Sequence, residues 1–183
     1  VSQLSYVVLG AALGTPTALA GGVIHIVSHA LLKITLFFCA GALYVTAHLE
    51  RVSQLGGIGR RMPLTMAAFT VAAFMLAGLP PGPAFLSKWH LLTGAVETGA
   101  WAAAAALLVS TVLNVAYFTP IVVRAFGPAR PGADPAGGPG EAPLPVLVPL
   151  LVTAAAGLAL GLAPDAGGHF LALARAVAES VNR

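Results

Sequence analysis

Long apolar runs separated by short polar segments dominate the chain. A helix that crosses a bilayer needs about 20 residues, and most of these runs approach or exceed that length. The first run is shorter, so we expect a truncated first span. The pattern predicts an all-α fold, a polytopic transmembrane helix bundle with about five spans, at residues 1–13, 17–47, 64–98, 101–126 and 143–162.

The run at 64–98 is interrupted near its middle. Pro80, Pro81 and Pro83 remove backbone donors and prevent a regular helix, so the run divides into two pieces that are each short for a crossing. We interpret the two pieces as one discontinuous helix. Irregular backbone at membrane depth survives only where protein or a water-filled cavity satisfies it, and discontinuous helices commonly form transport sites.

The remaining segments are polar connections. Residues 48–63 contain arginines and glycines, and residues 127–142 are rich in proline and glycine, so both are expected to be loops. Residues 164–183 mix apolar and charged positions in a pattern typical of a short amphipathic helix at a membrane surface. The sequence thus predicts a membrane domain over 1–163 and an interfacial tail after it.

Composition supports a membrane protein. Hydrophobic residues make up 58% of the chain, charged residues make up 8%, and the mean hydropathy is +0.91, whereas about a quarter of residues are charged in soluble proteins. Most of the basic residues behind the net charge of +3 lie outside the apolar runs, so membrane topology explains them and nucleic-acid binding is not implied. The single cysteine, Cys39, excludes an internal disulfide framework or a thiolate metal cage.

Three ionisable residues recur at helical spacing inside one apolar run. His25, His29 and Lys33 are four residues apart, so their side chains follow one another along a helix. Ionisable groups at membrane depth are rare and often belong to ion pathways or proton relays. The two histidines also have a spacing that suits a metal, but no carboxylate or third ligand is near, and we expect no metal there.

A second candidate lies just beyond the proline break. Burial disfavours the charged form of Lys88, whereas opened carbonyls or an acid would hold the proton, so this lysine can act as a carrier. A lysine that snorkels to the membrane surface is the structural alternative. His90 projects from another face of the same helix, and Ser110 and Asn114 share a face of the next one, where they extend a hydrophilic path or serve ordinary helix packing.

Four sequence segments together resemble a known family. They are SQLSY, HIVSHALLKITLFFCAGA, GGIGRRMP and LPPGPAFLSKW, within residues 1 to about 126. They are similar to the second half of the antiporter-like subunits of respiratory complex I and of the multisubunit sodium/proton antiporters of bacteria. The segment KITLFFCAGA is most similar to the D-type subunit of those antiporters.

The resemblance implies a subunit built from two inverted repeats, each with a broken helix that bears a lysine or an acid. Lys88 matches that residue of the second repeat, and His25, His29 and Lys33 match the central hydrophilic axis. We therefore expect this chain to be the C-terminal part of a longer subunit. Ala84 replaces a glycine that is usual in the break, so the local geometry there departs from the family pattern.

The expected function is translocation of protons, with sodium left open, in a multisubunit cation/proton antiporter. The expected partners are other membrane subunits of a hetero-oligomeric complex in the inner (plasma) membrane. One alternative is a proton-pumping subunit of a NADH:quinone oxidoreductase or membrane hydrogenase, and another is a structural or degenerate membrane fragment. Nothing in the sequence resembles a nucleophile and base pair or a cofactor loop, so we expect no catalytic site of its own and no cofactor.

Overall fold

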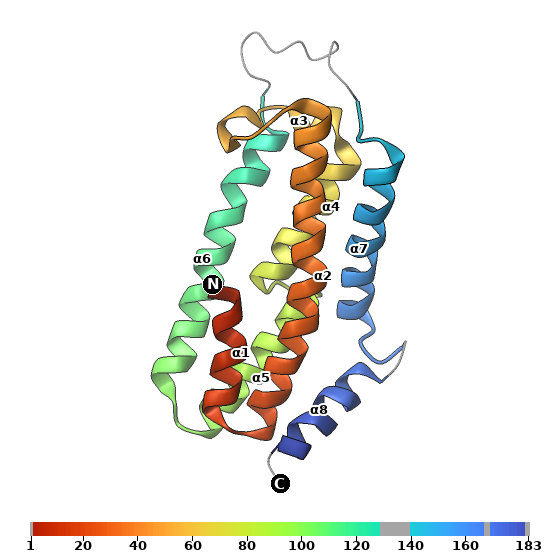
Figure 1. Ribbon diagram of the computed structural model, residues 1–183. Helices are drawn as coiled ribbons and strands as arrows, with labels where there is room; N and C mark the ends of the chain where they lie inside the picture. The colour runs from red at the N-terminus through yellow and green to blue at the C-terminus, as the bar shows by residue number, and fades with distance from the viewer. Residues whose placement is uncertain (1, 129–139, 167–168, 182–183) are drawn as a thin grey trace.

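The computed structural model describes residues 2–128, 140–166 and 169–181, and this part of the chain is folded into helices joined by turns (Figure 1). The predicted all-α class is confirmed. Parts of the loop predicted at 127–142 and of the tail predicted at 164–183 lie outside the described residues. The helices are α1 (Ser2–Leu13), α2 (Pro16–Ala47), α3 (Ile58–Arg61), α4 (Pro63–Ala77), α5 (Pro83–Glu97), α6 (Trp101–Phe126), α7 (Leu144–Leu162) and α8 (Phe170–Val181).

Three helices of the described chain, α2, α6 and α7, are long and apolar enough to cross a membrane. Helices α4 and α5 have 15 residues each, which gives about 22 Å at 1.5 Å per residue, less than the roughly 30 Å of a bilayer core. Figure 1 shows α4 beside one half of α2 and α5 beside the other half. That α4 and α5 make a single crossing together stays our interpretation.

Helix α2 is the element around which the others are arranged. It packs against α1, α4, α5, α7 and α8, and it runs the full height of the bundle in Figure 1. Its start is defined by Thr15, whose side chain accepts a hydrogen bond from the Ala18 N–H, and by Pro16 in the first turn. Its end is defined by His48, which adopts a left-handed conformation. Because both ends of α2 are defined in this way, the position of each of its residues along the bundle is defined as well.

The break between α4 and α5 begins with a glycine. Gly78 has a φ of +103°, and its N–H and that of Leu79 return to the carbonyl of Phe74, so α4 closes after Ala77. Two prolines follow, and Pro83 opens α5 at a position where a helix needs no donor. The carbonyl of Ala77, the last residue of α4, is thereby left without a partner in the helix.

Helices α2 and α5 approach each other closely at Gly21. A Cβ added to Gly21 would lie 2.9 Å from the backbone nitrogen of Leu91 and 3.0 Å from the backbone oxygen of Ser87. No side chain fits in that space, so the residue at this position must be glycine. The contact places the next turn of α2, which carries His25, against the turn of α5 that carries Ser87.

The segment 48–63, which we expected to be a loop, is partly helical. It contains a 3₁₀ turn at Val52–Gln54 and the short helix α3, which packs against α4 and α6. Ile58 is buried there, within an apolar cluster formed with α2, α4 and α7. The segment contains turns as expected, and its buried apolar side chains, which include Leu55 and Met62 beside Ile58, also anchor a helical turn.

Helix α8 has the amphipathic character that the tail sequence predicts. Ala174 and Ala178 are buried on one face, whereas Leu173 and Val177 remain exposed. The helix packs against α2, near the end at which α2 begins (Figure 1). Its position relative to the membrane surface stays a prediction.

Glu141 connects the segment before α7 to the first turn of α4. Its carboxylate accepts hydrogen bonds from the backbone N–H groups of Leu64 and Thr65 and from the Thr65 hydroxyl. A carboxylate at a helix N-terminus satisfies free donors and interacts favourably with the helix dipole. We expect Glu141→Ala to lower the free energy of unfolding by about 1–2 kcal/mol, measured by denaturant titration of the protein in detergent.

The matched control is Glu50→Ala. Glu50 is exposed, and none of its described hydrogen bonds involves its carboxylate. Its substitution should leave stability within about 0.5 kcal/mol of the parent protein. Equal effects of the two substitutions would contradict the capping role of Glu141.

Candidate functional site

A polar layer lies beside the break between α4 and α5, and its buried members are His25 of α2 and Ser87 and Lys88 of α5. On α5, Ser87 and Lys88 lie between Ala84 and Leu91, which belong to two different apolar clusters. On α6, polar positions within 110–114 likewise lie between members of the same two clusters. Apolar side chains therefore enclose this polar layer on both sides along the bundle.

Lys88 occupies the centre of the layer. Its side chain is only 7% exposed, and its ammonium donates hydrogen bonds to the Ala77 carbonyl at 2.6 Å and to the Thr111 hydroxyl at 3.2 Å. The Ala77 carbonyl is available because α4 ends there, and a cation at a helix C-terminus is stabilised by the helix dipole. The ring of Tyr6 lies 4.9 Å from the ammonium nitrogen. The break in the helix thus supplies the acceptor for a buried charge.

His25 lies next to this lysine site and is fully buried. Its Nδ1 is 2.9 Å from the hydroxyl oxygen of Ser87, and the direction of this hydrogen bond depends on the tautomer. Its Nε2 is buried and has no hydrogen-bond partner within the described chain. The ring of Tyr6 contacts it edge-on at 4.9 Å, and the ring of His29 stacks at 6.1 Å. One nitrogen of His25 is therefore hydrogen-bonded within the described chain and the other is not.

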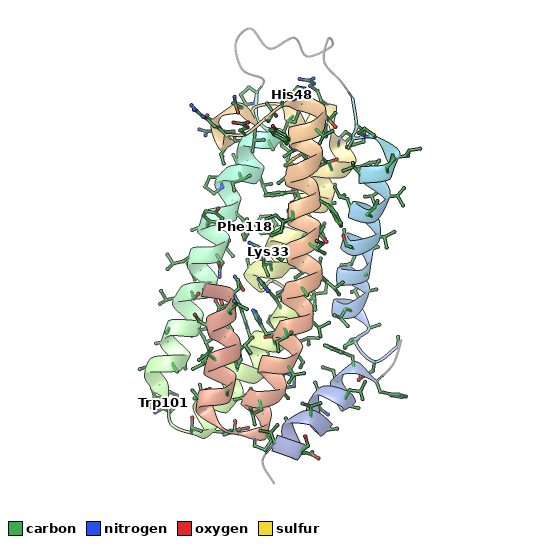
Figure 2. All side chains as sticks on the ribbon, in the orientation of Figure 1. Lys33, His48, Trp101 and Phe118 are labelled. Atoms are coloured by element: carbon green, nitrogen blue, oxygen red, sulfur yellow. The ribbon has the colours of Figure 1, made fainter. Side chains whose placement is uncertain are left out.

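The predicted row of His25, His29 and Lys33 turns around α2 as it ascends. Four residues advance an α-helix by about 400°, so each step rotates about 40° beyond a full turn. His25 is buried, His29 is half-buried and Lys33 is exposed, with its ammonium 5.2 Å from the ring of Phe37. Lys33 lies near the middle of α2 (Figure 2). The row thus leads from the interior of the bundle to its surface near the middle of α2.

The other three predicted residues have different environments. His90 lies outside the layer, where its Nδ1 is 2.8 Å from the Leu86 carbonyl. It borders a cavity of about 290 Å³ whose wall also includes Thr17, Arg175 and Glu179, from α2 and α8. On α6, Ser110 is hydrogen-bonded to the hydroxyl of Tyr6, and the Asn114 amide donates to that same hydroxyl. Ser110 and Asn114 therefore join the layer through a tyrosine.

Sequence reasoning missed Tyr6, Ser87 and Thr111 as members of the site. Ser87 directly precedes Lys88, and its place facing α2 could have been inferred from helical register. Tyr6 gave no comparable signal, because its partner Ser110 is 104 positions away in the chain. Within the described residues, no group of three or more His, Cys, Asp and Glu side chains is arranged to hold a metal.

Comparison with known proteins identifies the family. The family described as NADH:quinone oxidoreductase/Mrp antiporter, TM matches residues 1–114. NADH-quinone oxidoreductase subunit N of Desulforudis audaxviator is 46% identical over 135 residues, which are 73% of this chain and 27% of that protein. F(420)H(2) dehydrogenase subunit N of Methanosarcina mazei is 33% identical over 132 residues, 67% of this chain and 27% of that protein. The chain belongs to this family of membrane subunits.

A solved structure agrees over almost the whole chain. The structure of the Mrp complex from Dietzia sp. DQ12-45-1b matches with a TM-score of 0.87 and 28% sequence identity, covering 99% of this chain and 41% of the matched chain. The chain spans about a quarter of the length of the two curated relatives, 27% in each case. The resemblance inferred from motifs is confirmed at the level of the family, and the D-type subunit stays a prediction.

Gly78 provides a test of the lysine site. A Cβ added there would lie 2.8 Å from Cδ and 3.2 Å from Nζ of Lys88, in a backbone conformation that L side chains rarely adopt. We expect Gly78→Ala to displace the lysine and to lower the free energy of unfolding by about 1–2 kcal/mol, measured by denaturant titration. Gly41→Ala is the control, because a Cβ there meets no atom within 4 Å. A Gly78→Ala protein as stable as Gly41→Ala would contradict the packing described.

Proposed function

We propose that this chain is the proton-translocating part of a membrane subunit, and that His25, His29, Lys33 and Lys88 relay the proton. The single observation that carries the proposal is Lys88, a buried ammonium at the break of a helix with only neutral partners, the Ala77 carbonyl and the Thr111 hydroxyl. Because the partners of the Lys88 ammonium are neutral dipoles, the lysine can lose its proton without leaving a negative charge buried beside it. Such a lysine is suited to gain and lose a proton.

The neighbourhood of Lys88 supports a relay. The described chain places no carboxylate in hydrogen-bond contact with Lys88 or His25, and the two residues share Tyr6 as a neighbour. The free Nε2 of His25 can accept or donate a proton through water. The relay therefore needs no covalent step, only changes of protonation at fixed positions.

Lys33 is the end of the proposed proton path at the side of the bundle. It lies 17 residues after the start of α2, about 25 Å along the helix axis, and its side chain is exposed on the surface of the bundle. A charged group that faces lipid at this depth costs at least about 2.5–3.5 kcal/mol. We infer that protein covers Lys33, supplied by the rest of a longer subunit or by partner membrane subunits, in the plasma membrane.

The role of Lys88 can be tested in the complex that contains this subunit. We expect Lys88→Ala to lower proton flux by about a hundredfold or more, the usual cost of removing a group that transfers protons. Lys33→Ala should also lower it strongly, whereas His90→Ala should have a smaller effect because His90 lies outside the layer. The measurement is the uptake of protons by proteoliposomes under an imposed membrane potential.

The control for this test is Arg60→Ala, which removes an exposed cation of α3 outside the polar layer. It should keep the parent flux. The rival function is structural, with the polar groups serving only to hold helices together. In that case Lys88→Ala would keep its flux wherever the complex assembles, and our proposal would be wrong.

Two candidate functions remain, and they differ in the driving force for proton transport. The 28% identical Mrp structure supports cation/proton exchange, as the D-type resemblance predicts, whereas the relative with 46% identity is named an NADH-quinone oxidoreductase subunit. We favour the redox-driven complex because of that higher identity. The expected result is that NADH-dependent quinone reduction in membrane vesicles drives proton uptake without sodium. Proton movement that requires a sodium gradient and ignores NADH would support the antiporter instead.

A further inference from the structure

Tyr6, on α1, contacts both Lys88 and His25, the two buried titratable side chains of the polar layer. Its side chain is 5% exposed. The ammonium of Lys88 lies 4.9 Å from the centre of its ring, and the His25 ring meets it edge-on at the same centroid distance. A cation near the face of a tyrosine ring is attracted to it, more strongly where water is excluded. The ring therefore forms the third contact of the Lys88 ammonium.

The hydroxyl of Tyr6 is fixed from the opposite side by α6. It forms hydrogen bonds with the Ser110 hydroxyl and, at 3.4 Å, with the amide of Asn114. The Asn114 oxygen in turn accepts a hydrogen bond, at 3.5 Å, from Gln3, which lies one turn before Tyr6 on α1. These contacts connect two helices and restrict the tyrosine ring to one orientation.

The partners of the hydroxyl distinguish two roles that a tyrosine could have. A hydroxyl that carries the proton should connect two titratable groups. Ser110 and Asn114 are neither acids nor bases at physiological pH, so the described bonds of the Tyr6 hydroxyl lead to no further proton carrier. The hydroxyl instead anchors the ring, and the ring contacts Lys88 and His25. Tyr6 is therefore suited to holding those two side chains in place.

We propose that Tyr6 is a positioning residue for the proton step between His25 and Lys88, and that Ser110 and Asn114 anchor it. This proposal rests on the proposed function and assigns it a residue that does not itself carry the proton. The ring holds the lysine ammonium, and the bonds to α6 hold the ring. Loss of the anchor loosens both donor and acceptor, and proton transfer is sensitive to small changes in their separation.

The decisive substitution is Tyr6→Phe, tested in the whole complex reconstituted in proteoliposomes. Phenylalanine keeps the ring and its contacts with Lys88 and His25 and removes only the hydroxyl. We expect proton flux to fall about fivefold, the factor that corresponds to loss of one ordinary hydrogen bond. Tyr117→Phe is the matched control, since that tyrosine is 67% exposed on α6 and its ring contacts that of Phe118. It should keep the parent flux.

A second readout separates positioning from a general loss of folded protein. We expect the ratio of flux in H₂O to flux in D₂O to rise in Tyr6→Phe, because the loosened proton step becomes slower than the others. Loss of folded protein lowers both fluxes equally and leaves their ratio unchanged. Ser110→Ala should reproduce the effect of Tyr6→Phe, and Ser110→Thr should restore the flux because it keeps a hydroxyl.

A double variant shows whether one bond is responsible. Tyr6→Phe combined with Ser110→Ala should lose no more flux than Tyr6→Phe alone, since that substitution already breaks the hydrogen bond that Ser110→Ala removes. Unchanged flux in Tyr6→Phe, or lower flux with an unchanged isotope ratio, overturns the positioning role. A loss as large as that of Lys88→Ala also overturns it, because Tyr6 would then be a carrier.

The two proposals fail in different ways. If Lys88→Ala keeps its proton flux, the proposed function is wrong, whatever Tyr6 does. If Lys88→Ala abolishes flux while Tyr6→Phe leaves it unchanged, only the role of Tyr6 is wrong.

Discussion

The site depends on the contact between the Lys88 ammonium and the Ala77 carbonyl. A buried cation requires acceptors, and a regular helix offers none because its carbonyls are already used. The left-handed Gly78 and the prolines after it end α4 and release its last carbonyls. The lysine, one turn into α5, reaches back to one of them. The break therefore supplies the acceptor that the buried lysine needs.

Helix α2 connects that unit to the surface of the bundle. Gly21 brings α2 against α5, which puts His25 in reach of Ser87. The mismatch between a four-residue spacing and 3.6 residues per turn then carries the row outward, so that Lys33 is exposed. The four-residue spacing alone predicted that the three side chains follow one another in a single stripe along the helix. The structure shows a helical row whose first member, His25, is buried in the bundle and whose last, Lys33, is exposed on its surface.

The sequence predicted what is determined locally and missed what depends on distant packing. Apolar runs gave the all-helical fold, the prolines gave the break, and helical register placed His90, two residues after Lys88, on another face. Tyr6 could not be found in this way, since nothing local indicates that α1 packs against α2 and α5 or that the Tyr6 hydroxyl reaches Ser110 on α6. Ser110 and Asn114 were selected correctly as a pair that shares a face, but their partner was not foreseen.

Stability alone does not account for Lys88. Two hydrogen bonds and one ring contact compensate only partly for removing an ammonium from water, and apolar residues of similar volume often replace buried charges without loss of stability. The surrounding layer could therefore be filled by leucine or methionine in a purely structural helix bundle. We therefore propose that the lysine, the buried histidine and the anchored tyrosine of that layer serve a change of charge and do not only hold the helices together.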